Sequence, residues 1–84
     1  MKIAELAVGT HVRMNVFQDR SFEAIYVKGV CKKGTNIPIF GLFQPTDETL
    51  KKTGVKDFVR SNFPPNHYLH NCFIADDSDL IDLA

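Results

Sequence analysis

The alternation of apolar and polar residues near the start of the chain is that of a β-strand. In residues 10–17, Val12, Met14 and Val16 occupy every second position, and polar side chains fill the positions between them. Successive side chains of a strand point to opposite faces of its sheet. The pattern therefore predicts a strand over residues 10–17 with one buried face.

The next two apolar runs predict a β-hairpin. Residues 22–32 carry apolar side chains on both faces, which is typical of a central or bent strand, and Gly29 marks the expected bend. A turn containing Gly34 follows, and residues 37–43 form the second arm. Pro38 cannot donate a ladder hydrogen bond, so this arm is expected at a sheet edge or near a strand start.

The second half of the chain first changes to a helical spacing of apolar residues. Residues 47–62 begin with candidate N-cap residues, carry apolar residues at helical intervals and stop before Pro64, which predicts a short helical segment. Residues 68–75 predict a return strand. The segments at the two ends are ambiguous: residues 1–9 fit a helical turn or an extended lead-in, and residues 76–84 fit a last strand or a helical turn.

This order of elements predicts an α+β, β-rich domain that spans residues 1–84. Its sheet is expected to be small and antiparallel, and the SH3-like barrel is one closed form of such a sheet. Hydrophobic residues make up 44% of the chain, which is enough for one small core. The side chains expected in that core are Ile25, Val27, Phe40 and Phe73.

The cysteine content and the apolar runs indicate the compartment. Cys31 and Cys72 are too few for a disulfide scaffold. The sequence shows no signal peptide and no apolar run of the length that spans a bilayer. We therefore expect a cytoplasmic protein with reduced thiols and no membrane partner.

The formal net charge is zero, but the charges are distributed unevenly. Residues 1–60 hold ten Lys or Arg and six Asp or Glu, whereas residues 61–84 hold four Asp and no Lys or Arg. The acidic residues of the tail predict a protein-binding patch that consists of Asp76, Asp77, Asp79 and Asp82. If the hairpin tip lies beside the helical segment, a second, basic patch consists of Lys28, Lys32, Lys33, Lys51, Lys52, Lys56 and Arg60.

The residues with reactive or metal-binding side chains form no recognisable catalytic or metal motif. His67, His70 and Cys72, with Cys31, have the chemistry of zinc ligands, but their spacing matches no zinc knuckle. The tail aspartates lack the glycine and the distal glutamate of a calcium loop. No cofactor, no metal and no enzymatic activity are expected.

Small size, opposed charges and the lack of a catalytic motif favour a small protein-binding module. Such a module would serve as an adaptor, a regulator or an inhibitor, including as an accessory protein of a phage or mobile element. The alternative is a nucleic-acid-binding small β-barrel, in which an exposed Tyr26 or Phe40 stacks on bases within the basic patch. Homo-oligomers through exposed strand edges are a further expectation. The acidic tail packs its leucines internally or docks a partner.

Overall fold

A computed structural model describes residues 1–17, 20–52, 59 and 61–84. Within them, the chain forms five strands, one short α-helix and two 3₁₀ turns. In chain order these are η1 (Ile3–Glu5), β1 (His11–Phe17), β2 (Arg20–Cys31), β3 (Pro38–Pro45), α1 (Asp47–Leu50), β4 (Phe73–Ala75), η2 (Asp77–Asp79) and β5 (Leu80–Leu83).

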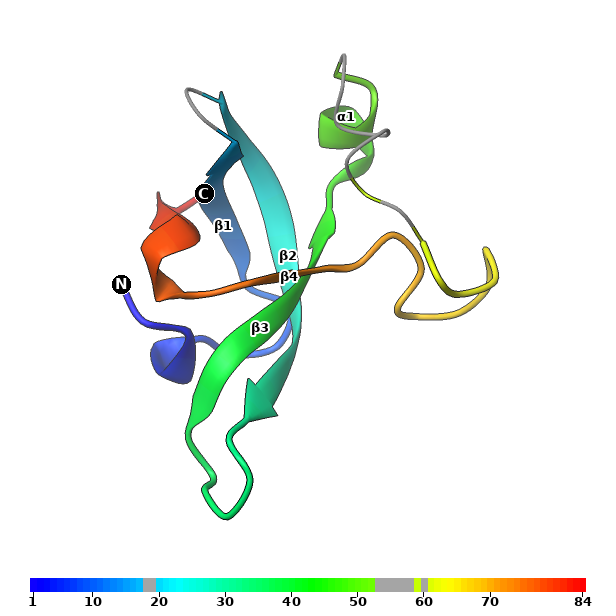
Figure 1. The fold of residues 1–84 in the computed structure, drawn as a ribbon. Helices are drawn as coiled ribbons and strands as arrows, with labels where there is room; N and C mark the ends of the chain where they lie inside the picture. The colour runs from blue at the N-terminus through cyan, green and yellow to red at the C-terminus, as the bar shows by residue number, and fades with distance from the viewer. Residues whose placement is uncertain (18–19, 53–58, 60) are drawn as a thin grey trace.

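The five strands form one antiparallel sheet in the order β4-β3-β2-β1-β5. The prediction of a small, β-rich domain with an antiparallel sheet is confirmed. The described strands β4 and β5 are the two edges and do not pair with each other, so the sheet is open and the SH3-like barrel is not confirmed. The long hairpin of β2 and β3 runs the length of the molecule (Figure 1).

The strand predicted over residues 68–75 is much shorter in the structure. Only Phe73–Ala75 is extended, and the residues before it form successive turns, closed by bonds such as His70 N–H to the carbonyl of His67 at 3.0 Å. Asn71 has φ of 62°, a left-handed conformation that a strand residue does not adopt. The alternating pattern overestimated the strand because local turn bonds compete with extended backbone here.

The helical segment predicted over residues 47–62 is represented by one helical turn. Thr46 caps α1, because its Oγ1 accepts a hydrogen bond from the N–H of Thr49 at 3.2 Å. The helix ends at Leu50, and residues 53–58 and 60 lie outside the described residues. The tail, which fitted two interpretations, contains both a 3₁₀ turn and the edge strand β5.

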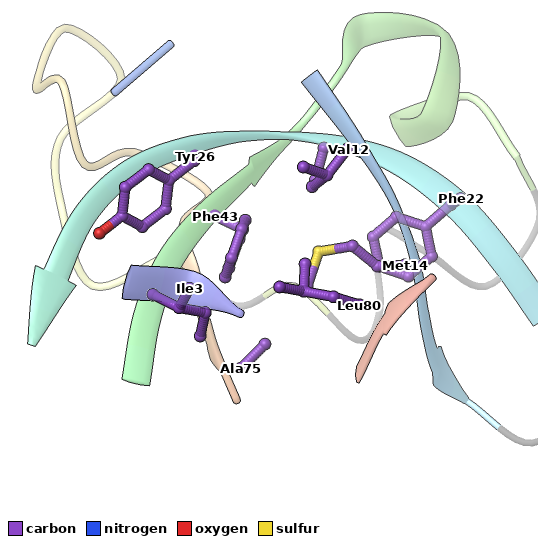
Figure 2. Close-up of a cluster of buried hydrophobic side chains, with 9 residues drawn as sticks. Ile3, Val12, Met14, Phe22, Tyr26, Phe43, Ala75 and Leu80 are labelled. Carbon is purple, nitrogen blue, oxygen red and sulfur yellow. The ribbon is translucent and has the colours of Figure 1, made fainter. Parts of the chain in front are cut away.

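The core lies on the concave inner face of the bent sheet and is covered by the two ends of the chain (Figure 2). Phe43 is fully buried at its centre, with its ring 5.4 Å from that of Tyr26. Ile3 of η1 is also fully buried, so the N-terminal turn contributes to the core. The buried cluster consists of Ile3, Val12, Met14, Phe22, Ala24, Tyr26, Phe43, Ala75 and Leu80.

None of the four predicted core residues, Ile25, Val27, Phe40 and Phe73, belongs to the buried cluster. The inner face of β2 carries Phe22, Ala24 and Tyr26, while Ile25 and Val27 are only half-buried. The prediction chose the wrong face because both faces of this strand are apolar. Phe40 is 39% exposed, which is a second correction. Phe73 is partly buried and packs against the buried cluster, so it contacts the core without lying inside it.

Two glycines pair across the hairpin of β2 and β3, between two irregularities of its register. Gly29 of β2 faces Gly41 of β3, and the ring of Tyr26 lies over both. A Cβ added at Gly29 would lie 2.6 Å from the Tyr26 hydroxyl oxygen, and one added at Gly41 would lie 2.7 Å from a ring carbon of Phe43. The two glycines are therefore needed because they allow aromatic rings to pack directly on the backbone.

Candidate interaction surfaces

The four aspartates of the predicted acidic patch all take part in contacts within the chain. Asp76 and Asp79 form a capping box around η2: Asp76 accepts from the N–H of Ser78 at 2.9 Å, and Asp79 accepts from the N–H of Asp76 at 3.0 Å. The hydroxyl of Ser78 also donates to Asp76, and these bonds lower the pKa of the Asp76 carboxyl.

Asp77 and Asp82 connect the tail to distant parts of the chain. Asp77 accepts a hydrogen bond from the N–H of Ile3 at 2.7 Å. Asp82 of β5 receives a two-pronged ion pair from Arg13 of β1, whose Nε donates at 2.7 Å, and this contact lowers the pKa of the Asp82 carboxyl. The acidic residues thus have local structural roles, while their predicted role in partner binding stays a prediction.

The described lysines of the predicted basic patch fall into two separate groups. The hairpin lysines are Lys28, Lys32 and Lys33, and the others are Lys51 and Lys52 after α1. Ala24 pairs with Pro45 just before α1, whereas the turn follows Cys31, so the turn lysines Lys32 and Lys33 lie roughly 23 Å from this end of β2 and Lys28 lies about 13 Å from it, at ~3.3 Å per residue. The hairpin turn and α1 lie at opposite ends of the sheet (Figure 1). Lys56 and Arg60 lie outside the described residues.

An exposed apolar surface lies at the hairpin end of the outer face, which is the face of the sheet opposite the core. Paired residues of neighbouring strands share a face, and the pairs here are Val30 with Phe40 and Leu42 with Ile74. We call these four residues the outer apolar patch. Phe40 is 39% exposed and Ile74 is 60% exposed. Lys28 pairs with Leu42 and therefore lies within this surface.

The sheet edge beside the outer apolar patch is poorly suited to strand addition. β4 covers only Gly41–Phe43 of β3, which leaves the first residues of β3 without a strand on that side among the described residues. That stretch begins at Pro38 and contains a register shift opposite Val30 and Cys31. A proline and an irregular register are features that block strand pairing. A partner would therefore contact the side chains of the outer apolar patch rather than add a strand to this edge.

A pocket of about 550 Å³ lies between α1, the outer face and the turns before β4. We call it the α1 pocket. Its volume is in the range of small-ligand sites, roughly 300–1,000 Å³. Its described lining residues are His11, Ile25, Gln44, Pro45, Thr46, Asp47, Leu50, Pro65, His70 and Asn71.

The side chain of His70 is fixed by the turns that form one wall of this pocket. Its Nδ1 lies 2.9 Å from the carbonyl oxygen of Phe63 and 2.9 Å from the hydroxyl of Ser61. A carbonyl oxygen can only accept, so Nδ1 is the donor in this contact and Nε2 is the ring nitrogen that is left for another partner. Gln44 donates through Nε2 to the carbonyl of His70 at 2.9 Å, which keeps its own Oε1 available as an acceptor.

The other candidate ligands of the sequence, His67 and Cys72, have local roles. The ring of His67 stacks between Phe63 at 4.6 Å and Tyr68 at 5.0 Å, and its Nδ1 accepts from the N–H of Leu69 at 3.0 Å. Cys72 is half-buried, and burial raises the pKa of its thiol, which disfavours the reactive thiolate.

The described residues contain neither a cluster of metal-ligand side chains nor a helix that could span a membrane. In that part of the chain, no three His, Cys, Asp or Glu side chains gather in a way that could hold a metal ion. Both Cys31 and Cys72 are free. None of the described helices is both long and apolar enough to cross a bilayer.

The fold and these surfaces define a small β-rich domain with an open five-stranded antiparallel sheet. Comparison with protein-family models, with curated proteins and with solved structures gives no match. Sequence reasoning missed both the outer apolar patch and the α1 pocket. The patch could have been anticipated from residues 22–32, which are apolar on both faces. A single open sheet packs its core on one face, so apolar residues on the other face are left exposed.

Proposed function

We propose that this protein is a small, non-enzymatic protein-binding module and that it binds its partner through the outer apolar patch. The observation that carries the proposal is the exposure of Phe40 and Ile74 side by side with Leu42 on a sheet face that no described segment covers at this end. A small domain with few apolar residues does not leave several of them in contact with water without cost. A partner that covers them recovers this free energy.

The charges around the patch favour an acidic partner surface. The hairpin residues 28–42 contain Lys28, Lys32 and Lys33 and no Asp or Glu. Within the described residues, none of these lysines forms an ion pair. Unpaired rim charges steer association with an oppositely charged partner and contribute less to the final affinity. Apolar contacts then supply the affinity, and the lysines supply rate and orientation.

A nucleic-acid partner is the second candidate, and the position of Phe40 favours it. Its exposed ring and Lys28 lie on the same face of the hairpin, which is an arrangement that can stack on a base and contact a phosphate. The separation of the described lysines weakens this alternative, because a single strand would meet only the hairpin lysines.

A matched pair of edge substitutions tests the proposal. Ile74→Ser changes an exposed residue of β4 within the patch, and Ile81→Ser makes the same change on the opposite edge strand β5, where Ile81 is 46% exposed. Phe40→Ser is a second variant within the patch. Tagged wild type and the three variants are used to capture partners from lysate, with and without nuclease, and the captured protein is then purified and its affinity measured directly.

The proposal expects a nuclease-resistant protein whose affinity falls about tenfold or more for Ile74→Ser and for Phe40→Ser, and stays within about twofold for Ile81→Ser. Equal binding by wild type and both patch variants would show that the interface lies elsewhere. Capture that disappears with nuclease would favour the nucleic-acid alternative.

A further inference from the structure

The α1 pocket combines apolar walls with polar groups that accept hydrogen bonds. Ile25 and Leu50 contribute apolar side chains, and Pro45 and Pro65 contribute rigid rings. A cavity of about 550 Å³ with such walls accommodates a side-chain-sized ligand. The other six described lining residues are polar, and they decide which ligand is recognised.

Two lining residues of the pocket carry acceptors whose side chains are fixed by hydrogen bonds within the chain. In His70, Nδ1 donates to the carbonyl of Phe63, so Nε2 is the ring nitrogen that is left to accept. Oε1 of Gln44 is an acceptor, because the amide nitrogen of the same side chain donates to the carbonyl of His70. In the described part of the chain, neither Nε2 nor Oε1 has a hydrogen-bond partner.

Asp47 adds a negative charge to these acceptors. Asp47 lies in the first turn of α1 and is one of the lining residues, and its carboxylate makes no hydrogen bond or ion pair with the described residues. No Lys or Arg is among the described lining residues. A carboxylate together with two further acceptors fits a cation that has several N–H donors.

From this set of groups we propose that the α1 pocket binds a guanidinium group, either on an arginine side chain of a partner or on a small free molecule. A guanidinium is always charged, has five donors in a planar fork and presents flat apolar faces that pack on proline and aliphatic side chains. An ammonium has a compact charge and no flat face, so it uses the carboxylate but not the walls. This site is separate from the outer apolar patch and does not depend on the function proposed for that patch.

The test uses blocked arginine, N-acetyl-arginine N-methylamide, titrated into the full chain and followed by amide chemical shifts in NMR spectra. Blocked citrulline has the same shape without the charge, and blocked lysine has the charge without the planar fork. Agmatine provides the free small-molecule arm. The expected result is a Kd on the order of millimolar for arginine, with shifts concentrated at residues 44–50 and 65–71, and binding weaker by about tenfold for citrulline.

A pair of neighbouring acidic residues provides the matched variants. Asp47→Asn removes the carboxylate in the pocket, and Glu48→Gln removes the next carboxylate of the same helical turn, which is not among the pocket residues. Binding of arginine should weaken about tenfold for Asp47→Asn and stay within about twofold for Glu48→Gln. Tighter binding of agmatine than of blocked arginine would identify a small molecule as the ligand, and the reverse would identify a partner's side chain.

Several results would overturn this proposal. They are no saturable shifts with blocked arginine or agmatine, equal binding of citrulline, and unchanged binding by Asp47→Asn. Ile74→Ser serves as a further control, because a change in the outer apolar patch should leave arginine binding unaltered. Loss of partner capture in that variant and loss of arginine binding in Asp47→Asn therefore report separately on the two proposals.

Discussion

Asp77 accepts a hydrogen bond of 2.7 Å from the backbone N–H of Ile3, although the two residues are 74 positions apart. Ile3 is completely buried against the core, so this contact holds the N-terminal turn and the C-terminal tail together over the inner face of the sheet. The acidic tail therefore contributes to folding at a place where its sequence suggested only a charged surface.

Removal of this acceptor should destabilise the protein. Asp77→Ala leaves the N–H of Ile3 without its partner and should lower the free energy of unfolding by about 1–3 kcal/mol. Asp77→Asn keeps an oxygen acceptor and should recover part of the loss. Urea denaturation measures both, with Glu5→Ala as the control in the same part of the chain. Equal stability of Asp77→Ala and Glu5→Ala would contradict the role of this hydrogen bond.

The capping box of η2 should make stability depend on pH in the acid range. Hydrogen bonds from the Ser78 hydroxyl and then from its backbone N–H lower the folded-state pKa of Asp76. The stabilisation is complete above the ordinary aspartate pKa of about 3.9 and is lost as the pH falls through the folded-state pKa. Wild type should therefore have a higher Tm than Ser78→Ala at neutral pH, and the difference should shrink on acidification. A difference that is constant with pH would count against this explanation.

The packing of Tyr26 on Gly29 should appear as coupling between two substitutions. Gly29→Ala places a methyl group 2.6 Å from the Tyr26 hydroxyl oxygen and should cost about 1–3 kcal/mol. In the Tyr26→Phe background this cost should fall, although contact with Pro38 at 2.9 Å remains. Gly41→Ala is the control, because its methyl group would meet ring carbons, which Tyr26→Phe keeps. Identical costs of Gly29→Ala in both backgrounds would exclude the coupling.

Two phenylalanines of β3 should differ strongly in their effects on stability. Phe43 is fully buried, so Phe43→Ala should cost about 3–5 kcal/mol through lost burial and a cavity. Phe40 is 39% exposed on the outer face, so Phe40→Ala should cost less than about 1 kcal/mol. Chemical denaturation of the two variants compares the costs, and similar values would mean that the faces of β3 are assigned incorrectly.

The local patterns of the sequence determined the first half of the fold. The alternation of Val12 and Met14 with polar residues specified β1 and its buried face, because only one face of that strand is apolar. Gly34 specified the hairpin turn, since its φ of 84° is a conformation that glycine adopts without strain. Thr46 specified the start of α1 through its side-chain cap.

Only the tertiary structure decided which face of β2 is buried and what the tail does. Both faces of β2 are apolar, so its own sequence cannot rank them, and the neighbours Met14 and Phe43 select the face of Tyr26. The contact of Asp77 with Ile3 joins the two ends of the chain, and no local pattern reports on partners so far apart. The α1 pocket likewise collects residues from β1, β2, β3, α1 and the turns before β4, so it exists only once the sheet has brought them together.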